Sequence, residues 1–282
     1  MINNSKNSLK IFLMGGTKDS INIIKFLKEE YTPSNSDLPY ILTTTTTDYG
    51  GKLAKEAGSD ELISYAMGKD EIVEILNNYS DGIGFDILID ATHPFAENAT
   101  STAIEAAKIA NVNYIRFERP TFDYSKYDNI HLVDSFKEVG ELLVSNFEGK
   151  NILHLAGVNT IEMIFKSNIA KENFYARVLP VISSIEKCDA LGIDGEHIIA
   201  MQGVFSKEFN KELMKELNIE VILTKESGAV GGVPSKIEAA YELGIDVILV
   251  NRPKIANLDD KNTVNNLSEL NKKLNSFFKS MK

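Results

Sequence analysis

Short apolar runs alternate with amphipathic stretches along most of the chain. Ile11–Met14 is wholly apolar, and the stretch after it carries apolar residues at helical spacing as far as Leu27. Ile87–Ile89 has the length and the β-branched content of a strand that is buried on both faces. Repeated strand–helix units of this kind predict parallel sheets that are covered by helices on both faces. The pattern therefore predicts the α/β class.

The alternation also predicts the individual elements. Strands are expected at 11–14, 39–43, 61–65, 87–89, 112–117, 131–133, 152–155, 174–179, 198–201, 221–224 and 247–250. Helices are expected at 21–27, 52–57, 70–76, 95–110, 136–147, 160–165, 183–191, 206–217, 234–243 and 267–278. The segment Glu148–Lys150 is a polar break with a glycine between two regular patterns. We place a domain boundary there, between an N-terminal domain 1–148 and a C-terminal domain 149–282.

The stretch Phe85–Pro120 organises the first half of the chain. Its strand ends at Asp90, and the following turn puts Pro94 at the expected first position of a helix. Ligands of open α/β sheets bind at the carboxyl ends of strands. Residues 90–94 and 116–119 both follow strand ends, so we expect them to belong to one site.

Composition narrows the possible classes of protein. The chain has 282 residues and a formal net charge of -10, which argues against binding nucleic acid through a basic surface. A single cysteine excludes an internal disulfide, and no histidines have a metal-ligand spacing, so we expect no metal. Met1–Lys10 lacks the apolar core of a signal peptide, and no apolar run is long enough to span a membrane. We expect a cytoplasmic monomer or small homo-oligomer with no membrane partner.

Two strand ends in the first half are candidates for nucleotide binding. Gly15, Gly16 and Thr17 follow the first strand, where glycines let the backbone approach a phosphate and a helix N-terminus offers free N–H groups. A plain tight turn is the alternative. Thr44 and Thr45 occupy the second strand end, where an acidic residue would bind the ribose of NAD. The preference of threonine for strands explains them equally well, so both NADPH and NADH stay open.

The second half contains a candidate anion site. Lys225 ends a predicted strand, and Ser227 and Gly228 begin a glycine-rich loop that leads to a helix N-terminus, an arrangement suited to anions. Lys236 lies in the first turn of that helix, where a cation opposes the helix dipole. A lysine in contact with solvent is the alternative for both positions.

Arginines end two of the predicted strands in a similar way. Arg119 and Arg252 each precede a proline, and Arg116 lies just before the first of these motifs. With Lys225 they place four cations at strand ends of an acidic protein, which predicts a site for an anionic ligand between the domains. Surface arginines in salt bridges are the alternative.

One histidine is a candidate for proton transfer. His93 is fixed between Thr92 and Pro94 and lies close to Asp90 in the sequence. It is a candidate proton donor or a hydrogen-bonding partner of a ligand, and helix capping is the competing role. The remaining histidines lie in or beside predicted strands, and we expect them to be structural.

Taken together, these motifs resemble the precorrin-6A reductase family of cobalamin biosynthesis. The string Asp-Ala-Thr-His-Pro-Phe-Ala is highly specific, and the lysine loop supports it independently. The matching pieces occur in the family's order between residues 10 and 253: Gly15–Thr17, Asp90–Ala96, Arg116–Pro120, Gln202–Gly203 with Phe205, Lys225–Gly228, Lys236 and Arg252–Pro253.

The resemblance implies two Rossmann-like parallel-sheet domains with a cleft between them. It implies hydride transfer from NADPH or NADH to the C18–C19 double bond of a precorrin, a tetrapyrrole with or without cobalt. His93 or Lys225, or a water, would supply the proton. The cofactor would be held by residues among Gly15, Gly16, Thr17, Thr44, Thr45, Asp90, Thr92, Ser227 and Gly228. Carboxylates of the substrate would be held by Arg116, Arg119, Lys225, Lys236 and Arg252.

The chain departs from the family pattern in two places. After Gly-Gly-Thr the family usually has an acidic residue, a small residue and an arginine, whereas this chain has Lys18–Ile21 and no arginine. Lys18 must then replace that arginine, or its contact is lost. Phe122 stands where the family usually has tryptophan.

Two other functions stay open. One is a two-lobed binding protein that closes on an anionic ligand without catalysis. The other is a nicotinamide reductase that acts on a small acid. The spread of cations over both halves argues against a small substrate.

Overall fold

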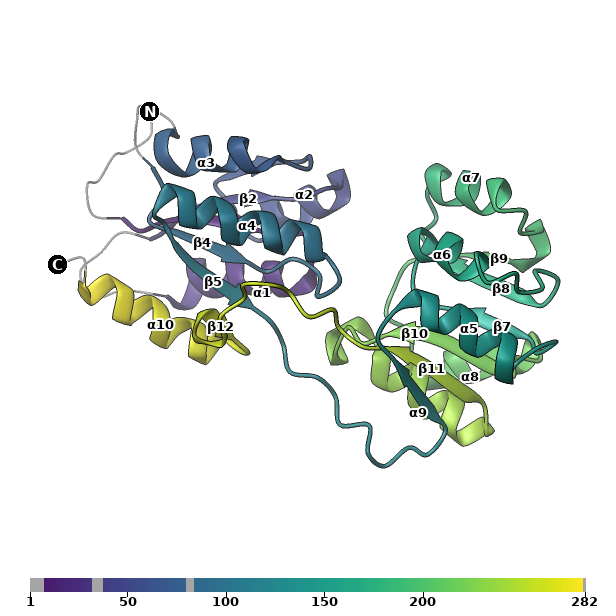
Figure 1. Cartoon of the computed structure of the whole chain (residues 1–282). Coiled ribbons are helices and arrows are strands. Elements are labelled where there is room, and N and C mark those ends of the chain that lie inside the picture. Colours follow the sequence, from purple (N-terminus) through teal and green to yellow (C-terminus); the bar gives the residue numbers. More distant parts are fainter. Residues whose placement is uncertain (1–7, 32–37, 80–83, 281–282) are drawn as a thin grey trace. The chain divides into compact units, whose positions relative to one another are not determined.

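The computed structural model describes residues 8–31, 38–79 and 84–280, which form two compact α/β units (Figure 1). Unit 1 comprises Met1–Pro120 and Lys254–Lys282, and unit 2 comprises Thr121–Pro253. Each unit contains a six-stranded sheet in which the paired strands are parallel. The predicted class, two parallel-sheet α/β domains, is confirmed.

The sheet of unit 1 has the strand order β12-β5-β4-β1-β2-β3. This is the order of the Rossmann fold, and it reverses direction between β1 and β4. The strands are β1 (Lys10–Met14), β2 (Tyr40–Thr44), β3 (Glu61–Ile63), β4 (Ile87–Asp90), β5 (Asn113–Phe117) and β12 (Thr263–Val264). The helices are α1 (Lys18–Lys25), α2 (Asp48–Glu56), α3 (Lys69–Asn78), α4 (Glu97–Ala110) and α10 (Leu267–Ser280).

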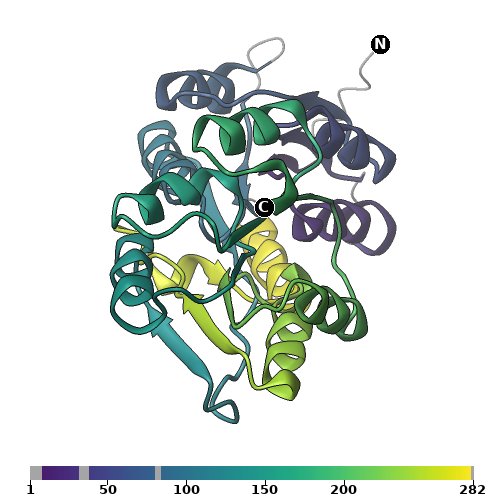
Figure 2. The same cartoon turned by 90° about the vertical axis from the view of Figure 1, so that its right-hand side faces the viewer.

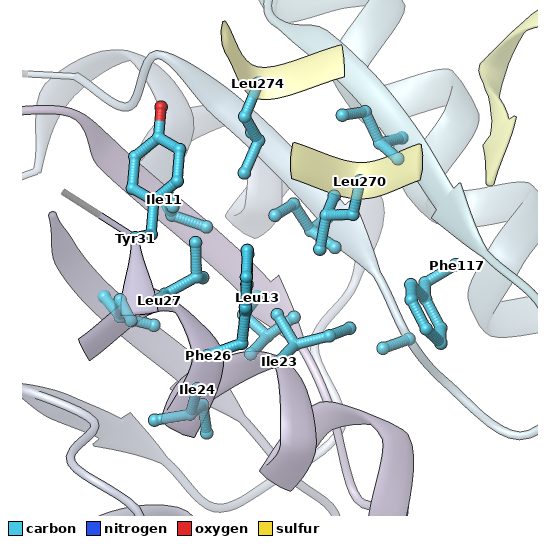
Figure 3. Packing of buried hydrophobic residues seen from close by; sticks show 14 of the residues in the cluster. Ile11, Leu13, Ile23, Ile24, Phe26, Leu27, Tyr31, Phe117, Leu270 and Leu274 are labelled. Atoms are coloured by element: carbon cyan, nitrogen blue, oxygen red, sulfur yellow. The ribbon is translucent and has the colours of Figure 1, made fainter. Parts of the chain in front are cut away.

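Helices cover both faces of this sheet. Ile11 and Leu13 of β1 pack in one cluster with α1, α2 and α10, and Figure 3 shows Leu270 and Leu274 of α10 pointing into it. Phe12 of β1 packs against α3 and α4 on the opposite face. Successive side chains of a strand point to opposite faces. A strand buried on both faces therefore needs the continuous apolar run seen in the sequence.

The sheet of unit 2 has the order β6-β11-β10-β7-β8-β9. Helices α8 and α9 pack on one face, and Figure 2 shows them (green) across the strands from α5 and α6 (teal). The strands are β6 (Ile130–Val133), β7 (Ile152–His154), β8 (Phe174–Val178), β9 (Ile198–Ala200), β10 (Val221–Lys225) and β11 (Asp246–Val250). The helices are α5 (Phe136–Asn146), α6 (Ile161–Phe165), α7 (Ile182–Ala190), α8 (Lys207–Glu216) and α9 (Val233–Leu243).

Both sheets have the same order, and each takes its sixth strand from an unexpected part of the chain. In unit 1 that strand is β12, which follows all of unit 2, and in unit 2 it is β6, which precedes the other five strands. This corrects the predicted boundary between 148 and 149. Residues 121–148, with β6 and α5, belong to unit 2, and residues 254–282 belong to unit 1. Periodicity identifies a strand but does not show which sheet it joins.

Each predicted strand and helix is present, with ends shifted by a few residues. The strand β12 was missed because it has only two residues. The start of α4 was also placed too early: the helix begins at Glu97, Ala96 is non-helical with ψ 53°, and Pro94 lies in the preceding turn. Within the described ranges, no helix combines the length and the apolar character needed to cross a membrane.

Candidate functional site

In unit 1 the strand order reverses between β1 and β4, and the loops after these two strands are hydrogen-bonded to each other. The hydroxyl of Thr17 donates to the carbonyl of Ala91 at 2.8 Å. The backbone N–H of Ala91 donates to Met14 O at 2.9 Å, and Gly15 N–H donates to Thr44 O at 2.8 Å. In open α/β sheets, ligands bind at this edge. The two loops therefore form the candidate site of unit 1.

The glycines at this edge meet the demands of a close-packed turn. A Cβ at Gly15 would lie 3.0 Å from Ser20 Oγ and 3.1 Å from Thr43 Cγ2. Gly16 has φ +88°, a conformation that side chains disfavour, and it has open space where a Cβ would be. Thr17 caps α1 by accepting from Ser20 N–H at 3.2 Å. The turn thus exposes backbone at a helix N-terminus, where a phosphate can bind.

The threonines after β2 have mainly structural contacts. Thr44 and Thr45 are buried, and the Thr45 hydroxyl donates to Thr47 O at 3.1 Å. Thr47 caps α2. These contacts favour the strand and turn role over ribose binding for Thr44 and Thr45.

Asp90 is the centre of a buried polar network at the end of β4. Its Oδ1 accepts from Thr92 N–H at 2.9 Å, from the Thr92 hydroxyl at 2.7 Å and from Arg116 Nη1 at 2.8 Å. Its Oδ2 accepts from the Tyr114 hydroxyl at 3.0 Å. Asp90 and Arg116 have no exposed surface. Because protein donors occupy both carboxylate oxygens, the geometry favours a positioning role for Asp90 over a direct contact with a ligand.

The arginines of unit 1 are paired with carboxylates. Arg116 contacts Glu118 at 3.2 Å as well as Asp90. Burial by itself lowers the pKa of Arg116, but these two carboxylates outweigh burial and raise it. Arg119 forms an ion pair of 3.0 Å with Asp19 in the first turn of α1. The salt-bridge alternative that we considered from the sequence therefore describes both arginines, although their partners lie inside the protein.

His93 stabilises the turn before α4. Its Nδ1 accepts from Phe95 N–H at 3.2 Å, and its ring lies 5.9 Å from that of Phe95, centroid to centroid. An Nδ1 that accepts a hydrogen bond leaves the proton of a neutral imidazole on Nε2. Nδ1 of His93 thus makes a structural hydrogen bond, and Nε2 of the neutral ring carries the proton.

Unit 2 has its own reversal of strand order, between β7 and β10, and an acidic cluster that matches the one around Asp90. The carboxylate of Glu226, directly after β10, accepts from Gly228 N–H at 3.0 Å and from the Tyr124 hydroxyl at 2.8 Å. It also forms an ion pair with Arg252. Each unit therefore holds a carboxylate between an arginine, a tyrosine and a backbone N–H two residues further on.

The loop after β10 packs so tightly that it requires glycine. A Cβ at Gly231 would lie 2.0 Å from the hydroxyl oxygen of Ser227, which is buried. Gly228 has φ +73° and Gly232 has φ +73°. This packing gives the predicted cofactor residues Ser227 and Gly228 a structural reason to be present, and leaves their role towards a ligand as a prediction.

Two lysines of unit 2 are withdrawn from solvent. Lys225 is partly buried, and this burial lowers its pKa. Lys236 is 8% exposed, and its Nζ donates to the Thr224 hydroxyl at 3.3 Å. Burial, followed by the charges of Arg177 and Lys225, lowers the pKa of Lys236 to about 7. The alternative of solvated lysines is wrong for Lys236, and a buried cation is suited to a ligand anion.

The sequence did not mark several residues of these sites. Asp19, Tyr114, Tyr124 and Glu226 were missed as partners of the arginines and carboxylates. The sequence did contain a signal for Glu226: it is an acidic residue directly after strand β10, much as Asp90 is an acidic residue at the end of strand β4. Arg177 was missed because an arginine in the middle of a strand has no distinguishing pattern.

Comparison with known proteins is consistent across sequence and fold. Residues 10–275 match the family "Precorrin-6x reductase CbiJ/CobK". The chain is 40% identical to a cobalt-precorrin-6A reductase of Methanothermobacter thermautotrophicus, with 94% of this chain and 83% of that protein covered. It is 41% identical to a cobalt-precorrin-6A reductase of Methanocaldococcus jannaschii, with 88% and 92% covered. A solved structure of CobK precorrin-6A reductase has the same fold, with a TM-score of 0.72, 18% identity, and 96% and 97% covered.

Proposed function

Because this chain belongs to the precorrin-6x reductase family, we propose that it reduces precorrin-6A or its cobalt form by hydride transfer from a reduced nicotinamide. The hydride goes to C19 of the C18–C19 double bond, and a proton completes the reduction at C18. The observation that carries the proposal is the family's motif string at 90–96, which begins at the last residue of β4, at the edge where the strand order of unit 1 reverses.

We assign the nicotinamide dinucleotide to the loop after β1. The residues there fit such a group. Gly15 has no room for a side chain, Gly16 has a backbone conformation that side chains disfavour, and Thr17 is the N-cap of α1. The Gly15 N–H already donates to Thr44 O, so the N–H groups at the N-terminus of α1 would hold the phosphates. The bound cofactor supplies the hydride, and the protein positions it and screens its charge. We expect Asp90 and Thr92 to fix the neighbouring loop, and the cleft that the family resemblance implies stays a prediction.

We assign the carboxylates of the macrocycle chiefly to Lys225 and Lys236. Both are desolvated, and a desolvated cation gains most from an anionic ligand. Arg116, Arg119 and Arg252 already have carboxylate partners. Their contribution is therefore to hold the strand ends in place, and any contact they make with substrate is secondary.

Two side chains are candidates for the proton donor, beside a water. The hydrogen bond from Phe95 leaves a proton on Nε2 of neutral His93. Burial lowers the pKa of Lys225, which makes it a better acid than an ordinary lysine. Separate variants of the two residues distinguish them, because only the donor's loss lowers kcat with little change in KM.

The reaction is tested by turnover of metal-free and cobalt-containing precorrin-6A with NADH and with NADPH in parallel. We expect oxidation of the nicotinamide that depends on the macrocycle, and the faster pair identifies the cofactor and the substrate form. Strand β2 ends in threonines and not in the acidic residue that would bind the ribose of NADH, so the structure does not decide between NADH and NADPH. A protein that binds the macrocycle but oxidises neither nicotinamide would be the non-catalytic binder. The cytoplasmic location and the small oligomeric state stay predictions from the sequence.

Lys225→Ala tests the lysine loop. We expect the KM for the macrocycle to rise about tenfold or more, or turnover to fall by a similar factor, because one charge-assisted contact is lost. Lys166→Ala is the matched control, since the Lys166 side chain is 72% exposed and pairs with Glu162 at the long distance of 4.0 Å. Kinetics of Lys225→Ala that equal those of the control would reject the role of Lys225.

A further inference from the structure

Arg177 of β8 is a partly buried arginine whose hydrogen-bond and ring contacts among the described residues are with uncharged groups. Its Nη1 donates to Asn210 Oδ1 at 3.4 Å, and its guanidinium carbon lies 5.2 Å from the centre of the Phe205 ring. Burial lowers the pKa of Arg177 to about 10. Among the described residues, no carboxylate contributes to that shift. Arg177 thus differs from the arginines at 116, 119 and 252, each of which has an ion pair.

Arg177 belongs to a group of cations. The Ser235 hydroxyl, one residue before Lys236, donates to Phe205 O at 2.9 Å, and the ring of Phe205 lies against the Arg177 guanidinium. Lys236 Nζ in turn reaches the hydroxyl of Thr224, next to Lys225. Consistent with this grouping, burial and then the charges of Arg177 and Lys225 lower the pKa of Lys236. In the part of the chain that the structure describes, no ion pair involves Arg177 or Lys236. We call Arg177, Lys225 and Lys236 the cation cluster of unit 2. Its members come from β8, the end of β10 and the first turn of α9.

Such a cluster is costly for the protein alone. Arg177 and Lys236 take part in no ion pair among the described residues, so burying their charges is unfavourable, and like charges nearby add to the cost. A set of residues that is unfavourable for stability but lies where α/β sheets bind ligands indicates a functional site. An oxyanion would compensate the charge, and the planar guanidinium of Arg177 can grip it with two parallel hydrogen bonds.

We propose that Arg177 completes, with Lys225 and Lys236, an oxyanion pocket in unit 2 and binds one anionic group of the ligands directly. The proposal rests on the proposed function for the identity of those ligands. The oxyanion is a carboxylate of the macrocycle or a phosphate of the nicotinamide cofactor, which share the chemistry that the cluster recognises. Phe205 and Asn210 hold the guanidinium in the orientation that the anion requires.

Arg177→Gln is the test, with Lys166→Gln as the matched control on the surface of the same unit. We measure kcat and both KM values of the complete protein, and the urea midpoint of each variant. We expect Arg177→Gln to raise one KM by about tenfold to a hundredfold, as the loss of a charge-assisted hydrogen bond predicts. A rise in the KM for the macrocycle identifies a carboxylate, and a rise in the KM for the nicotinamide identifies a phosphate.

The outcomes separate this inference from the proposed function. If the wild-type protein turns over and both KM values of Arg177→Gln equal those of the control, the oxyanion role is wrong. A fall in kcat alone would also contradict it. If Arg177→Gln fails to fold, Arg177→Lys decides, because it keeps the charge but loses the two-pronged geometry and should raise the same KM by a smaller factor. If the wild type has no reductase activity, titration of the macrocycle and of NADPH into wild type and variant still tests the pocket.

Discussion

The two units build the same sheet order but differ in how they treat positive charge. In unit 1, Arg116 and Arg119 are paired with carboxylates of the same unit. In unit 2, Arg252 is paired in the same manner with Glu226, whereas the pKa shifts of Arg177 and Lys236 have no carboxylate among their causes. The shared clamp of carboxylate, arginine and tyrosine is therefore part of the scaffold, and the cation cluster is an addition to it.

This difference indicates that the two units recognise ligands through different kinds of groups. In the proposed function, unit 1 offers backbone N–H groups at the start of α1 to the dinucleotide. Unit 2 offers the partly or fully buried cations of the cluster to the oxygens of an acidic ligand. The same fold can thus support two kinds of recognition, because the strand ends vary while the sheet is kept.

The largest expected effect comes from cutting the chain at different places. Residues 121–253 contain all six strands of the unit 2 sheet, and we expect this fragment to fold with a cooperative urea transition. Residues 149–282 lack β6 and α5, and they carry α10, whose partners Leu13 and Ile23 lie in unit 1. We expect no cooperative transition for that fragment. If the fragment 149–282 folded cooperatively and the fragment 121–253 did not, the assignment of β6 to unit 2 and of β12 to unit 1 would be wrong.

Asp90→Ala has the next largest effect, because it leaves the fully buried Arg116 without its main partner. We expect the free energy of unfolding to fall by about 3–5 kcal/mol, measured by urea denaturation. Glu226→Ala should cost less, since Arg252 keeps 11% exposure and can reach water. Lys137→Ala, in the exposed pair Lys137–Glu141, should cost less than about 0.5 kcal/mol. Equal losses for Asp90→Ala and Lys137→Ala would contradict the buried network.

The pH dependence of kcat/KM tests the cluster through Lys236. In the free protein its pKa is about 7, below the ordinary 10.5, because of burial and the nearby charges of Arg177 and Lys225. Above pH 7 the lysine loses its proton, so kcat/KM should fall by up to about tenfold per pH unit. His154, with a pKa of about 3, stays neutral over this range. Lys236→Gln should give lower kcat/KM without this fall, and an unchanged profile would contradict the assignment.

The same pKa shift has a consequence for stability. The charged form of Lys236 is disfavoured in the folded state, so the unfolded state binds more protons between pH 7 and 10.5. The contribution of Lys236 to stability is therefore least favourable below pH 7 and improves as the pH rises. We expect the urea midpoint of Lys236→Gln, relative to wild type, to be highest at pH 6.

Thr17→Val should have a smaller effect on stability than Asp90→Ala. It removes the cap of α1 and the hydrogen bond to Ala91, which together should cost about 1–2 kcal/mol in urea unfolding. Because the loop after β1 is assigned to the cofactor, the KM for the nicotinamide should rise more than that for the macrocycle. Thr47→Val is the control, since Thr47 caps α2 in the same way. A similar rise in the nicotinamide KM for both variants would reject the cofactor role of this loop.

Much of the fold could be predicted because local sequence determines it. Buried parallel strands need apolar runs, and helix starts such as Thr17 and Ser206 are marked by capping residues. The sheet that each edge strand joins could not be predicted. That choice depends on contacts such as those of Leu270 and Leu274 with β1, which are distant in the sequence.

The candidate sites were predictable where residues follow strand ends. Asp90 and Lys225 became candidates in this way, and their roles towards a ligand stay predictions. The burial of Arg116 was not, because its partner Asp90 lies on a neighbouring strand and is found only through strand pairing. Arg177 was missed for a related reason, since its importance depends on Lys225 and Lys236 from other elements.

The most direct test is calorimetric titration of the macrocycle and of NADPH into wild type and into the double variant Arg177→Gln/Lys236→Gln. We expect one of the two ligands to bind the double variant at least about a hundredfold more weakly while the other binds as before, since two charge-assisted contacts are lost. Wild-type affinities for both ligands in a double variant that folds normally would show that the cation cluster binds neither ligand.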